Sequence, residues 1–541
     1  MAYTAHIDTF VADHLPPPAQ QPRFLFELPQ LRFAPRLNCA RELLDRAVEA
    51  GAGARTCICA PGVTWSYADL HENANRIANV LVNDMGLVPG NRVLLRAANH
   101  PMLAACWWGV MKAGGIAVAT MPLLRAKELA AIVEIGQVSH ALCDAALAEE
   151  LALAALQARC LRQLRHFNAG GPHSLEACMA RAPCRFATVH TSADDPCLLA
   201  FTSGTTGVPK ATIHFHRDVM AVCHCWPPQM LQARAEDVFI GTPPLAFTFG
   251  LGGLLLFPLH VGASTVLLEK ASPAQLLEGI LEFQASVLFT APTCYRALAA
   301  HGAALRRSAL RKCVSAGEAL PAATRQLWKD TTGIELIDGL GTTEMLHIFL
   351  SHEEGNARPG ATGKPVHGYH ARVVDEEGHV VPPGTVGQLA VQGPTGCRYL
   401  SDARQASYVK DGWNLTGDAY VMDADGYFFH QARTDDMIIS AGYNIAPPEV
   451  EQALLQCPAV AECAVIGVPD AQRGQIVKAF VVLQPGHAGD AAMVQRLQDF
   501  VKQALAPYKY PRAVAFVAQL PRTPSGKIQR FRLAAPAGEG R

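Results

Sequence analysis

The sequence has no excess of charge of either sign: 46 Lys and Arg stand against 47 Asp and Glu, so the net charge of the 541 residues is -1. A chain without a basic field is a poor ligand for nucleic acid or for an anionic membrane surface, and we expect neither as a main partner. Charged residues make up only 17% of the chain and hydrophobic residues 50%. This composition excludes a largely disordered protein and supplies a sizeable core.

The chain also lacks an uninterrupted apolar run of the ~20 residues that a bilayer requires. The stretch 102–124 contains Lys112 and a Gly pair, and the stretch 250–268 is interrupted by Pro258 and His260. Both are predicted to be buried strand–helix or strand–strand segments. The first twenty residues have no basic cluster followed by an apolar core, so they do not resemble a signal peptide. We expect a soluble, cytoplasmic protein that is a monomer or a homodimer.

Sixteen cysteines are present, but no Cys-x-x-Cys pair. Cys223-His224-Cys225 and His214-x-His216 have the residue types of metal ligands without a partner pair at zinc-finger spacing, so we do not expect zinc there. Reduced thiols in a cytosolic protein are the simpler interpretation.

The order of predicted elements indicates an α/β protein. Strands at 93–96, 116–120 and 140–144 alternate with helices at 101–113 and 126–135, which is typical of parallel strands covered by helices. After residue 360 the pattern changes to short β runs with Gly and Pro between them, at 372–374, 380–381 and 387–391. This spacing predicts an antiparallel or barrel-like subdomain.

The last hundred residues form a third pattern. Strands are predicted at 460–468, 476–483 and 513–517, with a helix at 491–504. Such a set is sufficient for a small independent α+β domain. We therefore predict a large N-terminal domain of mixed α/β sheets with a β-barrel-like subdomain, followed by a small α+β domain.

The strongest local motif is Thr202-Ser203-Gly204-Thr205-Thr206-Gly207-Val208-Pro209-Lys210. Its glycines let the backbone approach an anion closely, its hydroxyl and amide groups can donate to phosphate oxygens, and Lys210 adds positive charge. It is not a Walker A loop, and the strands predicted on both sides leave no helix N-terminus to help bind the anion. An ordinary polar surface loop is the alternative interpretation.

This motif resembles the phosphate loop Ser-Gly-Thr-Thr-Gly-x-Pro-Lys of the adenylate-forming superfamily, which includes acyl- and aryl-CoA ligases, peptide-synthetase adenylation domains and beetle luciferases. Further motifs of that superfamily follow in its order: Gly341-Thr342-Thr343-Glu344, Thr416-Gly417-Asp418, Arg433-Thr434-Asp435-Asp436 and Pro521-Arg522-Thr523-Pro524-Ser525-Gly526-Lys527. The resemblance implies that a carboxylate attacks the α-phosphorus of ATP, that pyrophosphate leaves, and that the thiol of coenzyme A then displaces AMP.

The resemblance also implies the roles of individual residues. Glu344 would hold Mg²⁺, a cation that prefers oxygen ligands, and Asp418 would accept the ribose hydroxyls beside Arg433. Because both reactants are anionic, such a site must supply positive charge and close placement rather than a strong base. The implied ATP-binding residues are Thr202, Ser203, Gly204, Thr205, Thr206, Gly207, Lys210, Ala316, Gly317, Glu318, Asp338, Asp418 and Arg433.

By the same resemblance Lys527 is the catalytic lysine, acting with Glu344 and Thr343. Asp435 matches the hinge that separates an N-terminal adenylation domain, residues 1–434, from a mobile C-terminal domain, residues 435–541. Gly442 matches a narrow channel for coenzyme A. Without the resemblance, Lys527 would be an ordinary solvated lysine and Gly442 part of an ordinary turn.

Two positions depart from the superfamily pattern. Leu340 stands where an aromatic residue usually precedes the glycine of Gly341-Thr342-Thr343-Glu344, so adenine stacking there is weaker or is supplied elsewhere. Ala432 replaces a common glycine before Arg433, and we expect that change to be tolerated.

The segment around Ala246, Phe247 and Phe249, with Gly341 and His347, matches the acyl pocket and looks most like the benzoate-CoA ligase branch, in particular 2-aminobenzoate-CoA ligases. The two phenylalanines could pack against a flat ring, or could simply be core residues. His347 or Thr248 could accept a hydrogen bond from an ortho amino group, but benzoate or a hydroxybenzoate remains a possible substrate. Two alternatives stay open: transfer of the acyl group to a carrier protein, and a nucleotide-binding regulator without chemistry.

Overall fold

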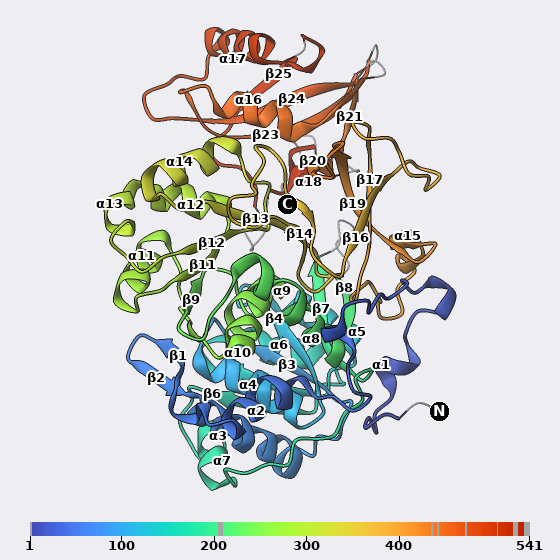
Figure 1. The fold of residues 1–541 in the computed structure, drawn as a ribbon, viewed down its shortest axis with the longest axis vertical. Coiled ribbons are helices and arrows are strands. Elements are labelled where there is room, and N and C mark those ends of the chain that lie inside the picture. The colour runs from blue at the N-terminus through green and yellow to red at the C-terminus, as the bar shows by residue number, and fades with distance from the viewer. Residues whose placement is uncertain are drawn as a thin grey trace.

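The computed structural model describes residues 3–203, 209–433, 436–440, 443–470, 473–505, 507–522 and 528–534. Four β-sheets with helices packed on them organise these residues, and the last sheet forms a small lobe at one end of the molecule (Figure 1). The predicted fold class is confirmed: a large part of mixed α/β sheets with an additional antiparallel sheet, followed by a small α+β part.

The first sheet has the strand order β6-β5-β3-β4-β7-β8, parallel except for the hairpin of the last two strands. The apolar stretch 102–124 contains most of a helix and, after it, a strand. Both elements are buried almost throughout, which accounts for the apolar composition of the stretch. Gly114, with φ +71°, makes the turn between them. The elements are β3 (Arg92–Arg96), α4 (Pro101–Lys112), β4 (Ile116–Thr120), α5 (Ala126–Gly136), β5 (His140–Asp144), α6 (Ala148–Gln157), β6 (Gln163–Phe167), β7 (Pro196–Ser203) and β8 (Pro209–Phe215).

The second sheet has nine strands in the order β15-β14-β13-β12-β11-β9-β10-β1-β2, with parallel pairing in its interior and antiparallel pairing at both edges. Helices α11 to α14 pack on the part that contains β11, β12 and β13 (Figure 1). The elements are β1 (Thr56–Ala60), β2 (Val63–Ser66), β9 (Val238–Gly241), β10 (Ser264–Val266), α11 (Pro273–Glu282), β11 (Val287–Thr290), α12 (Pro292–Leu298), α13 (Gly302–Leu305), β12 (Lys312–Ser315), α14 (Ala322–Thr332), β13 (Leu336–Gly341), β14 (Ile348–Ser351) and β15 (Lys364–Pro365).

The apolar stretch 250–268 differs from its prediction, because its first part is helical rather than extended. It consists of α9 (Thr248–Leu251), a π-helical turn η8 (Gly252–Leu256) and α10 (Phe257–Val261) before β10. Glycines permit this packing: a Cβ on Gly252 would lie 2.3 Å from the His347 ring, and one on Gly253 would lie 2.5 Å from the Phe289 ring.

The third sheet is antiparallel throughout and has five strands: β16 (His370–Val374), β17 (Val386–Gln392), β18 (Val409–Lys410), β19 (Trp413–Met422) and β20 (Phe428–Arg433). It occupies the place of the predicted barrel-like subdomain. The strand predicted at 380–381 is only a single bridge, between Val374 and Val380.

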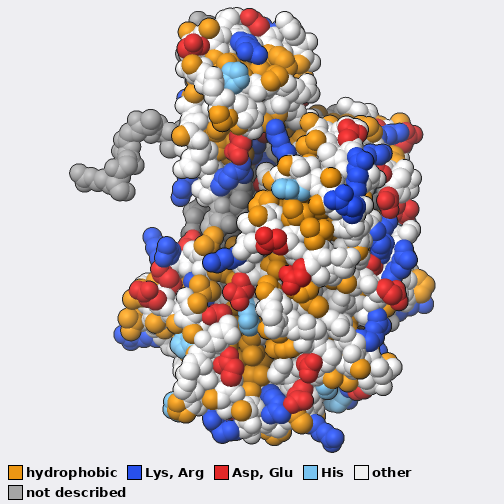
Figure 2. Space-filling view, turned by 90° about the vertical axis from the view of Figure 1, so that its left-hand side faces the viewer, with side chains coloured by type: hydrophobic (Ala, Val, Ile, Leu, Met, Phe, Trp, Pro, Cys, Tyr) orange, Lys and Arg blue, Asp and Glu red, His pale blue; other side chains and the backbone are white. Residues whose placement is uncertain are grey.

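The small lobe contains the fourth sheet, in which β24 pairs antiparallel with β23 and parallel with β25. Its elements are β21 (Ile438–Ser440), β22 (Tyr443–Ile445), α16 (Pro447–Leu455), β23 (Val460–Asp470), β24 (Gly474–Leu483), α17 (Ala491–Ala504), β25 (Ala513–Phe516) and α18 (Arg530–Ala534). On one face of the molecule, Lys and Arg side chains gather where this lobe meets the larger one (Figure 2). Within the described part of the chain, no helix is both long and apolar enough to cross a membrane.

Candidate active site

The predicted phosphate loop connects β7 to β8, and the strands predicted on its two sides are confirmed. Residues 204–208, which include Gly204, Thr205, Thr206 and Gly207, lie outside the described residues. Thr202 and Lys210 face each other across the hairpin. The Thr202 hydroxyl is buried without a hydrogen-bond partner among the described residues, as a donor reserved for a ligand would be.

Lys210 lies against a buried carboxylate. Its Nζ is 2.9 Å from Oε1 of Glu344, a side chain that is almost completely buried. The Tyr399 hydroxyl donates to the same Oε1 at 2.5 Å and accepts a hydrogen bond from Lys210. Burial alone would raise the pKa of Glu344, but Lys210 and Tyr399 together hold the pKa below its ordinary value. The site therefore keeps an anion next to a cation that can move to a phosphate.

The chain turns sharply directly after Glu344. Leu346 adopts a φ of 69°, in the left-handed region that a branched side chain seldom occupies, and its N–H donates to Thr343 O at 3.2 Å. Nε2 of His214, in β8, donates to the same Thr343 oxygen at 2.8 Å. Glu344 on one side of this turn contacts Lys210, and His347 on the other side is buried in the core. The strained backbone of Leu346 therefore lies between two predicted site residues.

Asp418 and Arg433 are brought together by register, because they are paired residues of β19 and β20. Arg433 Nη1 lies 3.0 Å from Asp418 Oδ1 and donates to Thr416 O at 3.1 Å. A Cβ on Gly417, between these residues, would lie 2.8 Å from the guanidinium, so glycine leaves room for it. The pair presents a carboxylate beside a cation, the arrangement predicted for the ribose.

Residues 316–318, predicted to line the adenine site, follow β12, and Asp338 lies on the adjacent strand β13. Gly317 has φ +89° and is exposed, whereas Ala316 is buried. Burial raises the pKa of Asp338 to about 7 despite the opposing charge of Arg325. The Asp338 N–H donates to Nε2 of His352 at 3.1 Å, which fixes the backbone at this point.

Asp338 should make folding stability depend on pH. Between the pKa of about 3.9 of a free Asp and the folded value of about 7, the folded chain retains a proton that the unfolded chain has lost. Its stabilising contribution is thus complete at low pH and is lost as pH rises toward 7. Between pH 5 and pH 8, the free energy of unfolding of the parent should fall by about 2–3 kcal/mol more than that of Asp338→Asn. Urea unfolding at both pH values measures this difference, and equal slopes would contradict it.

The predicted acyl-pocket residue His347 lies in a cluster of rings. Its imidazole is 4.5 Å from Phe257, 5.7 Å from Trp226 and 5.9 Å from Phe249 between ring centroids. Only 3% of His347 is exposed, and neither ring nitrogen has a hydrogen-bond partner among the described residues. Burial lowers its pKa to about 3, so the ring is neutral at physiological pH.

Of the other predicted pocket residues, Phe249 and Gly341 contact this cluster. Ala246, Phe247 and Phe249 are half-buried, at and just before the start of α9. Gly341 packs on the backbone of His347, since a Cβ there would lie 2.7 Å from the His347 oxygen. Phe249 also contacts the ring of Phe289 at 5.6 Å, but Phe247 has no ring–ring contact within the described part of the chain. The structure thus brings Phe249, Gly341 and His347 together.

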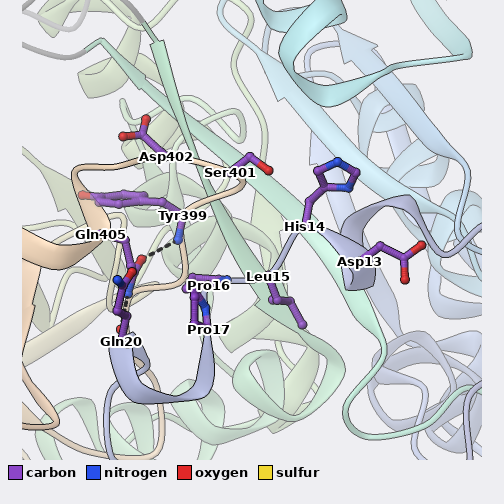
Figure 3. Close-up of a pocket in the computed structure, with 10 residues that line it drawn as sticks. All are labelled: Asp13, His14, Leu15, Pro16, Pro17, Gln20, Tyr399, Ser401, Asp402 and Gln405. Carbon is purple, nitrogen blue, oxygen red and sulfur yellow. Dashed lines mark hydrogen bonds between the residues drawn. The ribbon is translucent and has the colours of Figure 1, made fainter.

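A separate hollow of about 270 Å³ lies between the N-terminal segment 13–20 and the segment 399–405 (Figure 3). Tyr399 and Gln405 line it, whereas none of the described residues predicted for the acyl pocket does. Tyr399 therefore lies between two features: it lines the hollow, and its hydroxyl contacts the Lys210–Glu344 pair.

Two groups of described residues have the types and proximity to hold a metal ion: buried Cys39, Cys197 and His216, and the more exposed Asp375, Glu377 and His379. In the first group, the Cys39 N–H donates to Nδ1 of His216 at 3.2 Å, so this lone pair is already engaged. His216 thus takes part in a hydrogen-bonded core cluster. His214, its neighbour in the sequence motif, points instead to Thr343.

The predicted catalytic Lys527, hinge residue Asp435 and channel residue Gly442 lie outside the described residues. In sequence, the nearest described residues are Arg522 and Ile528 for Lys527, Arg433 and Asp436 for Asp435, and Ser440 and Tyr443 for Gly442. Arg522 Nη1 lies 3.9 Å from Glu318 Oε1, so Arg522 itself contacts a residue predicted to line the adenine site.

Comparisons with known proteins agree with this arrangement. The family model described as AMP-binding enzyme matches residues 44–399, and the model described as AMP-binding enzyme C-terminal domain matches residues 449–527. The chain belongs to this family. The predicted relation to the adenylate-forming superfamily is thereby confirmed. The residue roles and the domain boundary at 434/435 stay predictions.

Individual relatives align with nearly all of this AMP-binding enzyme. The benzoate–CoA ligase of Thauera aromatica is 34% identical over 511 residues, which are 93% of this chain and 97% of its own. The 3-hydroxybenzoate–CoA ligase of Aromatoleum sp. (strain CIB) is 31% identical over 522 residues, 93% of this chain and 98% of its own. The crystal structure of the anthranilate CoA ligase AuaEII in complex with anthranoyl-AMP is similar with a TM-score of 0.88 and 34% identity, covering 94% of this chain and 98% of that one.

Proposed function

We propose that the chain is an ATP-dependent aryl-CoA ligase that activates 2-aminobenzoate, or a close benzoate analogue, as an acyl adenylate and then forms the aryl-CoA thioester with release of AMP and pyrophosphate. The observation that carries the proposal is the pairing of Lys210, on the β7–β8 hairpin, with the buried carboxylate of Glu344. The Asp418–Arg433 pair and the ring cluster around His347 are further arrangements of predicted site residues that support it. Relatives that act on benzoate, 3-hydroxybenzoate and anthranilate support it.

In the proposed adenylation step, each of the predicted site residues has a separate role. Lys210 leaves Glu344 and neutralises the phosphates of ATP, while the Thr202 hydroxyl donates to a phosphate oxygen. The carboxylate of Glu344 fits Mg²⁺, which when bound would screen the negative charge that develops on the leaving pyrophosphate. Asp418 accepts from the ribose hydroxyls and thereby aligns the α-phosphate with the incoming carboxylate.

The ring cluster supports an aromatic acid rather than a long aliphatic chain. Phe249 offers a ring face or edge to a flat substrate. The neutral imidazole of His347 has one unprotonated nitrogen, which can accept from an ortho amino group, while its N–H is directed to the Phe249 backbone, a contact that opposes the lowering of its pKa. His347 is thus the residue that we propose recognises the 2-amino substituent.

Replacing His347 by Leu should lower kcat/KM for 2-aminobenzoate by roughly 10-fold or more relative to benzoate, because a hydrogen bond to the substituent is lost while the apolar volume is kept. Steady-state kinetics with both acids measure the ratio. Phe257→Leu is the matched control: it removes a ring that packs on His347 and should affect both acids alike. An unchanged ratio in His347→Leu would exclude His347 as the recognition residue.

The proposed activity is tested by incubating the protein with ATP, Mg²⁺ and coenzyme A and a panel of carboxylic acids. We expect coenzyme A–dependent formation of AMP with aryl acids, the highest kcat/KM belonging to 2-aminobenzoate or benzoate. If medium or long aliphatic acids outcompete every aryl acid, the substrate proposal is wrong. If a loaded carrier protein replaces coenzyme A as the preferred acceptor, the ligase assignment is wrong.

A further inference from the structure

Tyr399 contacts both members of the Lys210–Glu344 pair, although it belongs to none of the motifs found in the sequence. It is 1% exposed, and its hydroxyl both donates to Glu344 Oε1 at 2.5 Å and accepts from Lys210 Nζ. The ammonium of Lys210 also lies 4.5 Å from the centre of the Tyr399 ring. The hydroxyl of Tyr399 thus contacts both charged partners, and Lys210 in addition lies close to its ring.

The backbone around Tyr399 is fixed from two sides. Residues 398–400 run along β8, the strand that carries Lys210: Ile213 N–H donates to Arg398 O at 2.8 Å, and Leu400 N–H donates to Ala211 O at 2.9 Å. On the other side, Gln405 Oε1 accepts from the Tyr399 N–H at 2.8 Å (Figure 3). These hydrogen bonds fix the backbone of Tyr399 relative to β8, the strand that carries Lys210.

Tyr399 contacts Glu344 asymmetrically. The hydrogen bond from Tyr399 and the ion pair with Lys210 both go to Oε1. These two contacts leave the second oxygen, Oε2, for a divalent cation in the arrangement that we propose. When Lys210 moves to the phosphates of ATP, the Tyr399 hydroxyl stays in contact with Glu344. Without it, a buried carboxylate would lose its fixed direction and a compensating donor at once.

We propose that Tyr399 is a positioning residue of the adenylation site, which acts through Glu344 to orient that carboxylate for the cation bound to ATP and receives Lys210 while no nucleotide is bound. This inference rests on the proposed function, because it assigns a role within the same site. It predicts that the hydroxyl matters for the dependence on divalent cation more than for the turnover of the saturated enzyme.

The decisive variant is Tyr399→Phe, which removes the hydroxyl and keeps the ring under Lys210. At fixed ATP, the Mg²⁺ concentration for half-maximal acid-dependent adenylation should rise roughly 10-fold, whereas kcat at saturating Mg²⁺ should fall less than about 3-fold. Calorimetric binding of ATP, with and without Mg²⁺, gives a readout that needs no turnover. The factor by which Mg²⁺ tightens ATP binding should shrink about 10-fold in the variant.

Tyr295→Phe is the matched control, because Tyr295 is a buried tyrosine whose hydroxyl donates within reach of two carbonyl oxygens, Leu288 O at 3.0 Å and Val314 O at 2.9 Å. It should leave the Mg²⁺ dependence unchanged, whatever its effect on stability. In a Glu344→Gln background, Tyr399→Phe should cause little further change in Mg²⁺ dependence. Should Tyr399→Phe not fold, Gln405→Ala, which frees the Tyr399 backbone, should shift the Mg²⁺ dependence in the same direction.

Unchanged Mg²⁺ dependence of both adenylation and ATP binding in folded Tyr399→Phe would overturn the inference while leaving the proposed function intact. A full additional effect in the Glu344→Gln background would also overturn it, since Tyr399 would then not act through Glu344. Failure of the proposed function is distinguished by the parent protein, which would then form no adenylate with any acid.

Discussion

Replacing Lys527 by Ala is expected to lower the rate of adenylation by about 10²–10³-fold while leaving thioester formation from a preformed aryl adenylate nearly unchanged. The reason is that an ammonium group that stabilises the charge of the adenylation transition state commonly contributes about 3–4 kcal/mol, and the second half-reaction does not use it. Among the described residues of the small lobe, Arg522 lies 3.9 Å from Glu318, which is predicted to bind ATP.

The two half-reactions are separated by pyrophosphate exchange with acid and ATP, and by release of AMP from synthetic aryl adenylate and coenzyme A. Lys502→Ala is the control, because Lys502 belongs to α17 of the same lobe and, within the described ranges, forms an ion pair only with Asp499, three positions away. It should leave both rates as they are. An equal loss of the two half-reactions in Lys527→Ala would contradict the assigned role.

The second large effect concerns stability. Arg398 is 2% exposed, its guanidinium lies between the rings of Phe24 and Phe215 at 4.3 and 3.7 Å, and Nη2 is 2.6 Å from the buried Asp218 Oδ2. Arg398→Met leaves the Asp218 carboxylate buried without its main partner. We expect the free energy of unfolding to fall by about 3–5 kcal/mol, measured by denaturant unfolding.

A double-mutant cycle separates charge from packing. Asp218→Asn removes the unpaired charge but keeps an oxygen that accepts from the Phe215 N–H, a bond of 3.2 Å in the parent. Arg398→Met combined with Asp218→Asn should therefore be more stable than Arg398→Met alone. Arg217→Met is the comparison: this arginine pairs with the more exposed Asp194 and lies 3.8 Å from Asp218 Oδ1, so its loss should cost less than the loss of Arg398. A double variant no more stable than the single one would show that ring packing, not charge, is lost.

Local sequence patterns predicted those features that depend on neighbouring residues. The strands and helices between 92 and 144 begin and end within about a residue of their predicted positions, because buried parallel strands and their covering helices have distinct hydrophobic patterns. The motifs likewise placed Lys210 and Glu344 in one site, and the pairing of Asp418 with Arg433 follows from two adjacent strands.

Sequence could not reveal contacts between residues far apart in the chain. Tyr399 is 189 positions from Lys210, and Arg398 is 180 positions from Asp218, so no spacing rule connects either pair. The helical start of the stretch 250–268 was missed for a related reason. Its glycines fit against the His347 and Phe289 rings, which are contributed by other parts of the fold.

The central claim is that a carboxylic acid becomes a mixed anhydride with AMP before it meets coenzyme A. The most direct measurement supplies 2-aminobenzoate whose carboxylate carries heavy oxygen, together with ATP, Mg²⁺ and coenzyme A, and determines the isotope content of the AMP by mass spectrometry. Attack of the carboxylate on the α-phosphorus predicts that each AMP formed carries one labelled oxygen. Unlabelled AMP, or ADP as the nucleotide product, would contradict the account.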